Sequence, residues 1–304
     1  MAETVPSEHL VEWAKTDNRR FLHAVYRVGN LDKTIKFYTE CLGMQLLRKR
    51  DIPEENYSNA FLGFGPEETH FVLELTYNYG KDSYDIGSGF GHFAIATEDD
   101  PDDYTFELIQ RGPTPEPLCQ VMLRVTDLDR AINFYEKALG MKLLRKKDNK
   151  KYKVNVLLFI IAAVLCVHYS DDGVMHDEME STVLELTYNY GVTEYTKGDA
   201  YAQIAISTDD VYKSAEVVNL AIQELGGKIT RQPGPIPGIN TKITSFLDPD
   251  GWKIAQHCNI LIASKAAYSR VKLIDFLLNI LASKHLVEVL VDNQDFLKEL
   301  HKEE

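Results

Sequence analysis

Cysteine is scarce in this chain, which has four cysteines among 304 residues. Cys41, Cys119, Cys166 and Cys258 are widely separated and form neither a CxxC pair nor a dense framework. This spacing argues against a disulfide scaffold and favours free thiols in a reducing compartment. Residues 1–20 are polar and of mixed charge, without the apolar segment of a secretory signal or the acid-poor composition of a transit peptide, so we expect a cytoplasmic protein.

Positive charge is also in deficit, because 33 lysines and arginines face 46 aspartates and glutamates. The net charge of -13 repels the phosphates of nucleic acids and anionic membrane surfaces, and no basic stripe offsets it. We therefore expect neither a nucleic-acid partner nor a membrane partner. The twelve consecutive apolar residues Val156–Val167 are fewer than the roughly 20 that cross a bilayer, and we interpret them as a buried or aggregation-prone strand.

What the chain does contain is an internal repeat. The string VLELTYNYG occurs at residues 72–80 and again at 183–191, and residues 30–49 share twelve of twenty positions with residues 127–146. A third match follows each of these, GHFAIATEDD in the first half and AQIAISTDD in the second. Three matches in one order, about a hundred residues apart, predict two fused copies of one domain and not a solenoid.

Each copy is predicted to run strand, helix, strand, strand. Residues 21–28 alternate between two faces, as a half-buried strand does. The following helix is expected to begin after Asn30 and to end at Gly43, and its counterpart lies between Asp127 and Gly140. A further helix is expected over residues 210–225.

The two copies differ in length. From His92 to Glu107 is 15 residues, whereas the matching span from Gln203 to Ala255 is 52, so the first copy has lost about 37 residues. Parallel neighbouring strands need a connection of a dozen or more residues. We therefore expect the Glu107 strand either to pair with the His92 strand as an antiparallel hairpin or to detach.

The expected boundaries are a tail over 1–21, a first domain over 22–115 and a second domain over 116–304. Insertions are expected near 154–177 and 255–288, the second of them with an amphipathic helix around Leu273 to Ile280.

Metal-capable residues lie singly on otherwise apolar predicted strands, at His23, Glu74, His92 and Glu107. Any one of them is most simply a core or edge residue satisfied by backbone donors. Their joint pattern favours a divalent metal site, because a buried charge needs a partner, and imidazole with carboxylate suits Zn²⁺, Ni²⁺, Co²⁺ or Fe²⁺.

Four segments of the chain resemble a known family: LHAVYRVGNLDKTIKFYTECLGMQLLR, VLELTYNYG, GFGHFAIATED and PDDYTFELIQ. They are similar to the glyoxalase I family, the lactoylglutathione lyases of the vicinal-oxygen-chelate superfamily, and especially to its fused two-domain plant form. The resemblance implies an α+β fold of tandem βαβββ modules, here with a truncated first copy, whose sheets surround one divalent ion. Each site in that family combines the first module of one copy with the second module of the other.

Carried over position by position, the resemblance implies one complete and one degenerate site. The complete metal-ligand set is Gln120, Glu185, His92 and Glu107. The other set is His23, Glu74 and Gln203, with Ala255 where the last glutamate is expected. We therefore expect one working site.

The family holds glutathione with an arginine and an asparagine. These residues correspond to Arg124 and Asn189 at the complete site, and to Arg27 and Asn78 at the other.

The implied reaction converts the hemithioacetal of methylglyoxal and glutathione to S-D-lactoylglutathione, which detoxifies methylglyoxal. A Ni²⁺ or Zn²⁺ ion would stabilise an enediolate, Glu107 would remove the proton, and Glu185 would be the facing carboxylate. A monomer is expected, because two fused copies supply what single-copy relatives obtain by dimerising. Two alternatives stay open: an impaired or inactive glyoxalase-like binding protein from a mis-spliced gene, and another superfamily member such as a dioxygenase, against which the fourth ligand position and LELTYNYG argue.

Overall fold

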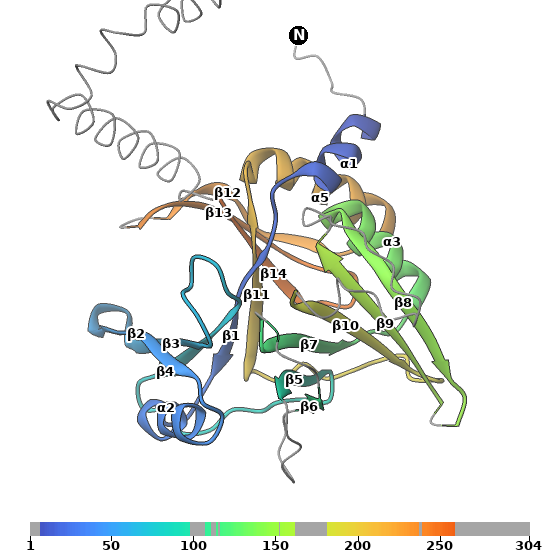
Figure 1. The fold of residues 1–304 in the computed structure, drawn as a ribbon. Coiled ribbons are helices and arrows are strands. Elements are labelled where there is room, and N and C mark those ends of the chain that lie inside the picture. The colour runs from blue at the N-terminus through green and yellow to red at the C-terminus, as the bar shows by residue number, and fades with distance from the viewer. Residues whose placement is uncertain are drawn as a thin grey trace, which may run out of the picture. The chain divides into compact units, whose positions relative to one another are not determined.

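The computed structural model describes residues 7–97, 107–110, 114, 116–151, 153–161, 181–236 and 239–258 (Figure 1). The amphipathic helix expected around Leu273 to Ile280 lies outside these ranges, as does Cys166. Within them, each helix is too short or too polar to traverse a lipid bilayer. In these ranges, Cys41 and Cys258 are free thiols, and Cys119 Sγ lies 3.6 Å from the carbonyl oxygen of Ala94.

The helices of the repeat begin where their capping residues predict. The second ends beside Gly140 as expected, whereas the first ends at Glu40, before the expected Gly43. The helices are α1 (Ser7–Thr16), α2 (Leu31–Glu40), α3 (Leu128–Leu139) and α5 (Val211–Leu225), with a 3-10 turn at Pro53–Glu55. Asn30 accepts a hydrogen bond from the Lys33 N–H, and Asp127 accepts one from the Arg130 N–H, both at 2.9 Å. Gly140 closes α3 at a φ of +60°, a conformation that glycine adopts without a steric penalty.

The larger of the two sheets has eight strands. Its order is β12 (Lys228–Ile236), β13 (Ile239–Leu247), β14 (Lys253–Cys258), β11 (Tyr201–Thr208), β1 (Phe21–Arg27), β4 (Val72–Asn78), β3 (Tyr57–Gly63) and β2 (Gln45–Ile52). Strands β1 to β4 come from the first copy and β11 to β14 from the second. The two groups meet where β1 pairs antiparallel with β11.

The smaller sheet has six strands. Its order is β6 (Glu107–Gln110), β5 (Phe90–Thr97), β7 (Leu118–Arg124), β10 (Val183–Asn189), β9 (Val154–Ile161) and β8 (Met141–Asn149). Here β5 of the first copy pairs antiparallel with β7 of the second. Both sheets therefore combine the first module of one copy with the second module of the other, as the family resemblance implies.

Strand β6 departs from the sequence-based expectation. It pairs with β5 in parallel, with Ala94 opposite Glu107, so the expected antiparallel hairpin or detachment of the Glu107 strand is wrong. The connection from residue 98 to residue 106 is nine residues long. An extended chain of that length spans up to roughly 30 Å, whereas returning past a four-residue strand takes only about 13 Å. The short strand makes the short connection sufficient.

Strand β9 accounts for the start of the apolar run. It lies between β8 and β10, and Leu157, Leu158 and Phe159 on it are buried. It is therefore a buried strand, as the apolar run predicts. Its place in the sheet is that of β3 in the larger sheet, so residues 154–161 of the segment expected as an insertion belong to the repeated module. Residues 162–180 of that segment lie outside the described residues.

One continuous apolar core joins the two sheets. It includes Leu62 and Leu73 of the larger sheet together with Leu123 and Phe159 of the smaller one. Helix α5 packs on β12, β13 and β14 and also against α3, and the two helices run close together in Figure 1. The core fixes the sheets that carry the candidate site residues.

Candidate metal and substrate site

Three of the expected ligands converge at the centre of the six-stranded sheet. Gln120 on β7 lies opposite Val183 of β10, which places Glu185 two residues further along the same face. Ala94 of β5 lies opposite Gln120, which places His92 on that face from the other side. The Gln120 side-chain nitrogen Nε2 lies 2.6 Å from Glu185 Oε2 and 3.3 Å from His92 Nε2.

The Glu185 carboxylate has a second donor. Thr187 Oγ1 donates to Glu185 Oε1 at 2.9 Å, while Gln120 donates to the other oxygen. Gln120 is buried, whereas Glu185 and His92 are half-buried. Both carboxylate oxygens are therefore held, and the carboxylate is still accessible.

The backbone also places the position of Glu107 beside this group. Residue 107 lies opposite Ala94 in the parallel pairing of β5 and β6. In the larger sheet, Ala255 of β14 lies opposite Ala205 of β11 in the same kind of pairing. Because Ala94 and Ala205 are themselves equivalent in the repeat, Glu107 and Ala255 hold equivalent register positions. The side chain of Glu107 lies outside the described residues.

The groups around Gln120 fit a divalent cation. The described residues contain no cluster of three His, Cys, Asp or Glu side chains that could by themselves hold a metal ion, so an amide would have to take part. Around Gln120 the group comprises one imidazole, one carboxylate and one amide. Turning the amide would bring its oxygen to where its nitrogen now lies, next to the carboxylate oxygen of Glu185 and the imidazole nitrogen of His92. Imidazole nitrogen with oxygen donors suits Ni²⁺ or Zn²⁺.

The second expected group lies on the eight-stranded sheet and has a different composition. His23 Nε2 lies 3.4 Å from Glu74 Oε2, and Asn59 donates to Glu74 Oε1 at 2.8 Å. Gln203 lies opposite Val25 on the same face, and Ala255 is buried.

An additional histidine that the sequence motifs did not indicate lies in this second group. The ring of His257, on β14, is 5.5 Å from the ring of His23. Burial lowers the pKa of His23 to about 3 and the pKa of His257 to about 4, so both rings are neutral at physiological pH. Burial also raises the pKa of Glu74. The contact between His23 and Glu74 is therefore not a charged pair, despite its short distance.

The expected substrate-binding residues lie further along the same strands. Arg124 is four residues beyond Gln120 on β7, a separation of about 13 Å on the same face, and Asn189 is four residues beyond Glu185 on β10. Arg124 Nη1 donates to the carbonyl oxygens of Ser88 and Phe90, both at 2.9 Å. The backbone N–H of Asn189 donates to the Tyr195 hydroxyl at 3.3 Å.

Their counterparts at the other site make similar contacts. Arg27 donates to the carbonyl of Asp199 at 2.7 Å, and the Asn78 side chain donates to the Tyr84 hydroxyl at 2.8 Å. Each arginine side chain therefore donates to backbone carbonyl oxygens of the other copy.

Comparison with known families identifies the superfamily of the chain. The family model of the glyoxalase/bleomycin resistance protein/dioxygenase superfamily matches residues 20–108 and again residues 118–255. The chain belongs to this superfamily.

Within the superfamily, the chain is similar to plant enzymes along nearly its whole length. It is 57% identical over 333 residues to a lactoylglutathione lyase of Oryza sativa subsp. japonica, covering 98% of each chain. It is 57% identical over 324 residues to a lactoylglutathione lyase of Arabidopsis thaliana, covering 96% of this chain and 98% of that one.

The chain is also similar to solved structures. Glyoxalase I from Zea mays is 59% identical, with a TM-score of 0.75, covering 84% of this chain and 97% of that chain. A putative dioxygenase from Bacillus subtilis is 12% identical with a TM-score of 0.55, which shows a shared fold and no more.

Two residues that contact expected site residues carried no sequence signal: Thr187, which donates to Glu185, and Trp252, whose indole N–H donates to the Arg124 carbonyl oxygen. Thr187 is one of several threonines in the repeated strings, and Trp252 follows the DPDG turn, far from the ligands in sequence. Comparison of the two VLELTYNYG strings gives no hint of Thr187, because Thr76 holds the same position in the other copy.

Proposed function

We propose that this protein is a lactoylglutathione lyase that isomerises the hemithioacetal of methylglyoxal and glutathione to S-D-lactoylglutathione. The convergence of Gln120, Glu185 and His92 from three strands of both copies carries this proposal. The 57% identity to plant lactoylglutathione lyases over almost the whole chain supports it.

One divalent ion, Ni²⁺ or Zn²⁺, is the proposed cofactor, and glutathione is the co-substrate. The proposed ligands are Gln120, Glu185, His92 and Glu107. When bound, the ion would act as a Lewis acid that lowers the energy of negative charge on the substrate oxygens. The degenerate set of His23, Glu74 and Gln203 has Ala255 in place of the fourth ligand, so we assign turnover to the complete set alone.

The protein's carboxylates would move the protons. Glu107 takes the proton from the carbon that bears sulfur, and a glutamate returns a proton to the neighbouring carbonyl carbon. The hydroxyl proton passes from the first oxygen to the second, so that a thioester and a secondary alcohol result. Glu185, whose two oxygens are held by Gln120 and Thr187, is the facing carboxylate. Positioned acid–base groups typically contribute 10² to 10⁴ in rate.

The substrate's glutathionyl part would lie along the strands beyond the ligands. Arg124 and Asn189 lie about 13 Å from Gln120 and Glu185, which suits an extended tripeptide. Arg27 and Asn78 are the corresponding pair at the degenerate site. We further propose a cytoplasmic monomer that binds this small molecule and neither nucleic acid nor membrane.

The decisive experiment follows thioester formation from the preformed hemithioacetal by ultraviolet absorbance. We expect activity that disappears on chelation and returns with Ni²⁺ or Zn²⁺. Glu107→Gln should lower kcat by at least about 10². The control Glu74→Gln removes the carboxylate of the degenerate set, at the position equivalent to Glu185, and should leave kcat within about twofold. Binding of metal without turnover under any ion would instead favour the impaired binding protein.

A further inference from the structure

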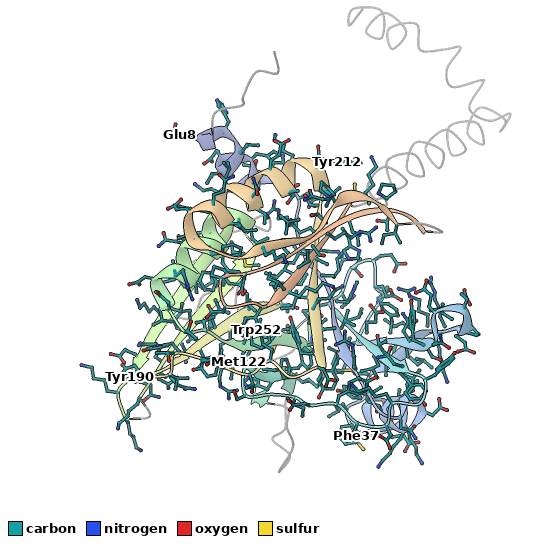
Figure 2. All side chains as sticks on the ribbon, turned by 180° about the vertical axis from the view of Figure 1, so that it is seen from behind. Glu8, Phe37, Met122, Tyr190, Tyr212 and Trp252 are labelled. Carbon is teal, nitrogen blue, oxygen red and sulfur yellow. The ribbon has the colours of Figure 1, made fainter. Side chains whose placement is uncertain are left out.

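Trp252 is buried at the junction of the two sheets, although it belongs to neither expected ligand set. Its exposed fraction is 1%, and Figure 2 places it, with Met122, in the interior of the fold. It follows the turn between β13 and β14, in which Asp248 Oδ1 accepts the N–H groups of Asp250 and Trp252 at 3.0 and 2.7 Å. The indole also packs edge-on against the ring of Tyr201 at 5.4 Å. The turn therefore holds the indole firmly.

The indole N–H of Trp252 is directed at Arg124. Trp252 Nε1 donates to the Arg124 carbonyl oxygen at 2.9 Å. On the other side, the Arg124 N–H donates to the carbonyl of Gly89 at 2.9 Å. A Cβ on Gly89 would lie 2.8 Å from the indole, so the indole packs directly against the backbone of Gly89. Both backbone groups of Arg124 are thus held by elements outside its own strand.

The equivalent arginine at the degenerate site shares only part of this arrangement. The Arg27 N–H donates to the carbonyl of Ala200 at 2.8 Å, just as that of Arg124 donates to Gly89. No indole is left for Arg27, because the chain's second tryptophan, Trp13, lies on α1 beside Arg19. The indole donor therefore distinguishes the arginine of the complete site from its counterpart.

We infer that Trp252 is a positioning residue for substrate binding, which fixes Arg124 so that its guanidinium can hold a carboxylate of the glutathionyl group. This inference rests on the proposed function and on the role given there to Arg124. It assigns the turn before β14, on the sheet of the degenerate set, a part in substrate binding at the complete site.

Trp252→Phe removes the indole donor and keeps a ring against Tyr201. Loss of one ordinary hydrogen bond should raise KM for the hemithioacetal about fivefold, with kcat changed by less than about twofold. The affinity for S-hexylglutathione, an inert glutathione thioether, should fall by about the same factor in calorimetry. The matched control Trp13→Phe should change neither quantity.

A double-mutant cycle separates positioning from a general loss of structure. If Trp252 acts through Arg124, Trp252→Phe should weaken S-hexylglutathione binding in the parent protein and have no further effect in an Arg124→Ala background. An equal effect in both backgrounds would overturn the inference. If the parent and Arg124→Ala bind the thioether equally well, the proposed role of Arg124 in substrate binding is wrong. This outcome differs from an equal effect of Trp252→Phe in both backgrounds, so failure of the proposed function and failure of the inference can be told apart.

A measurement on the unaltered indole covers the case in which Trp252→Phe does not fold. In Trp13→Phe, Trp252 is the sole tryptophan. Saturating S-hexylglutathione should change its fluorescence emission, and this change should be absent in Trp13→Phe/Arg124→Ala. Emission that is unaffected by saturating ligand would contradict the inference.

Discussion

Single side chains distinguish the two sites, although the strands that carry them are repeated. Gln120 and His23 hold the same position on β7 and β1, and Glu107 and Ala255 hold the same register position on β6 and β14. A methyl group can neither bind a metal ion nor move a proton. One exchanged residue is therefore enough to remove the acid–base group of the degenerate site.

Asp248, in the turn that carries Trp252, gives a residue-scale prediction on pH. Burial raises the pKa of its carboxyl to about 7, against the opposing effect of the N–H groups of Trp252 and Asp250. In the unfolded chain an aspartate has a pKa near 3.9. Between these values the folded state holds a proton that the unfolded state has lost, so the free energy of unfolding falls as pH rises from about 4 to about 7.

Asp248→Asn should remove this part of the pH dependence, because the amide keeps an acceptor for both N–H groups and cannot ionise. Urea unfolding at about pH 5 and about pH 7 should differ by roughly 2 kcal/mol less in the variant than in the parent. Other groups keep a slope in this variant: burial raises the pKa of Glu116 to about 7, and the lowered pKa values of His23 and His257 act in the opposite direction below about pH 6.5. An unchanged slope in Asp248→Asn would show that this carboxyl is already ionised in the folded protein.

Among the elements, β5 depends on close packing against β7. A Cβ on Gly91 would lie 2.2 Å from the sulfur of Met122 and 3.0 Å from its carbonyl oxygen. Gly91 directly precedes His92, and Met122 lies between Gln120 and Arg124. The missing side chain at residue 91 therefore allows His92 to approach Gln120.

Gly91→Ala should force Met122 or β5 to move, lowering stability by about 1–3 kcal/mol and reducing kcat. The larger sheet carries alanine and valine at the matching positions, Ala202 on β11 and Val25 on β1. Gly91→Ala/Met122→Val should therefore recover most of the loss in both melting temperature and kcat. The control Gly234→Ala adds a Cβ in open space and should change neither.

Local signals predicted the elements well, and long-range pairing explains what they did not predict. The caps at Asn30 and Asp127 define the helices from a few adjacent residues, and the repeat identifies equivalent strands. The sequence wrongly predicted that β6 would pair antiparallel with β5 or detach. The rule that a parallel connection needs a dozen or more residues assumes a full-length strand, whereas β6 has four residues. The contacts of His257 and Trp252 join residues more than a hundred positions apart, and no spacing within either copy reveals them.

For the whole molecule, the exchange of modules predicts that neither copy is active alone. The segment 1–115 contains His92 and Glu107, whereas 116–304 contains Gln120 and Glu185. Separately, each segment would also leave β1 or β7 without its antiparallel neighbour, an exposed edge that favours association. We keep these sequence-based boundaries as our proposal for the domains.

Segments 1–115 and 116–304, purified separately, should each lack isomerase activity and regain it on mixing, with a rate that depends on their concentrations. An intact chain cut by a protease site placed between residues 115 and 116 is the control and should stay active. Turnover by either segment alone would contradict the shared site.

The position of Trp252 bears on which mutations a duplicated enzyme can tolerate during evolution. After duplication, one of two sites can lose its acid–base residue while the other keeps the activity. The strands around the first site would then ordinarily accumulate mutations without consequence. Here the sheet that carries the degenerate set still supplies the indole that donates to the carbonyl of Arg124. If Trp252 positions Arg124 as proposed, mutations that loosen that sheet would weaken substrate binding at the complete set, which gives natural selection a reason to preserve the turn before β14.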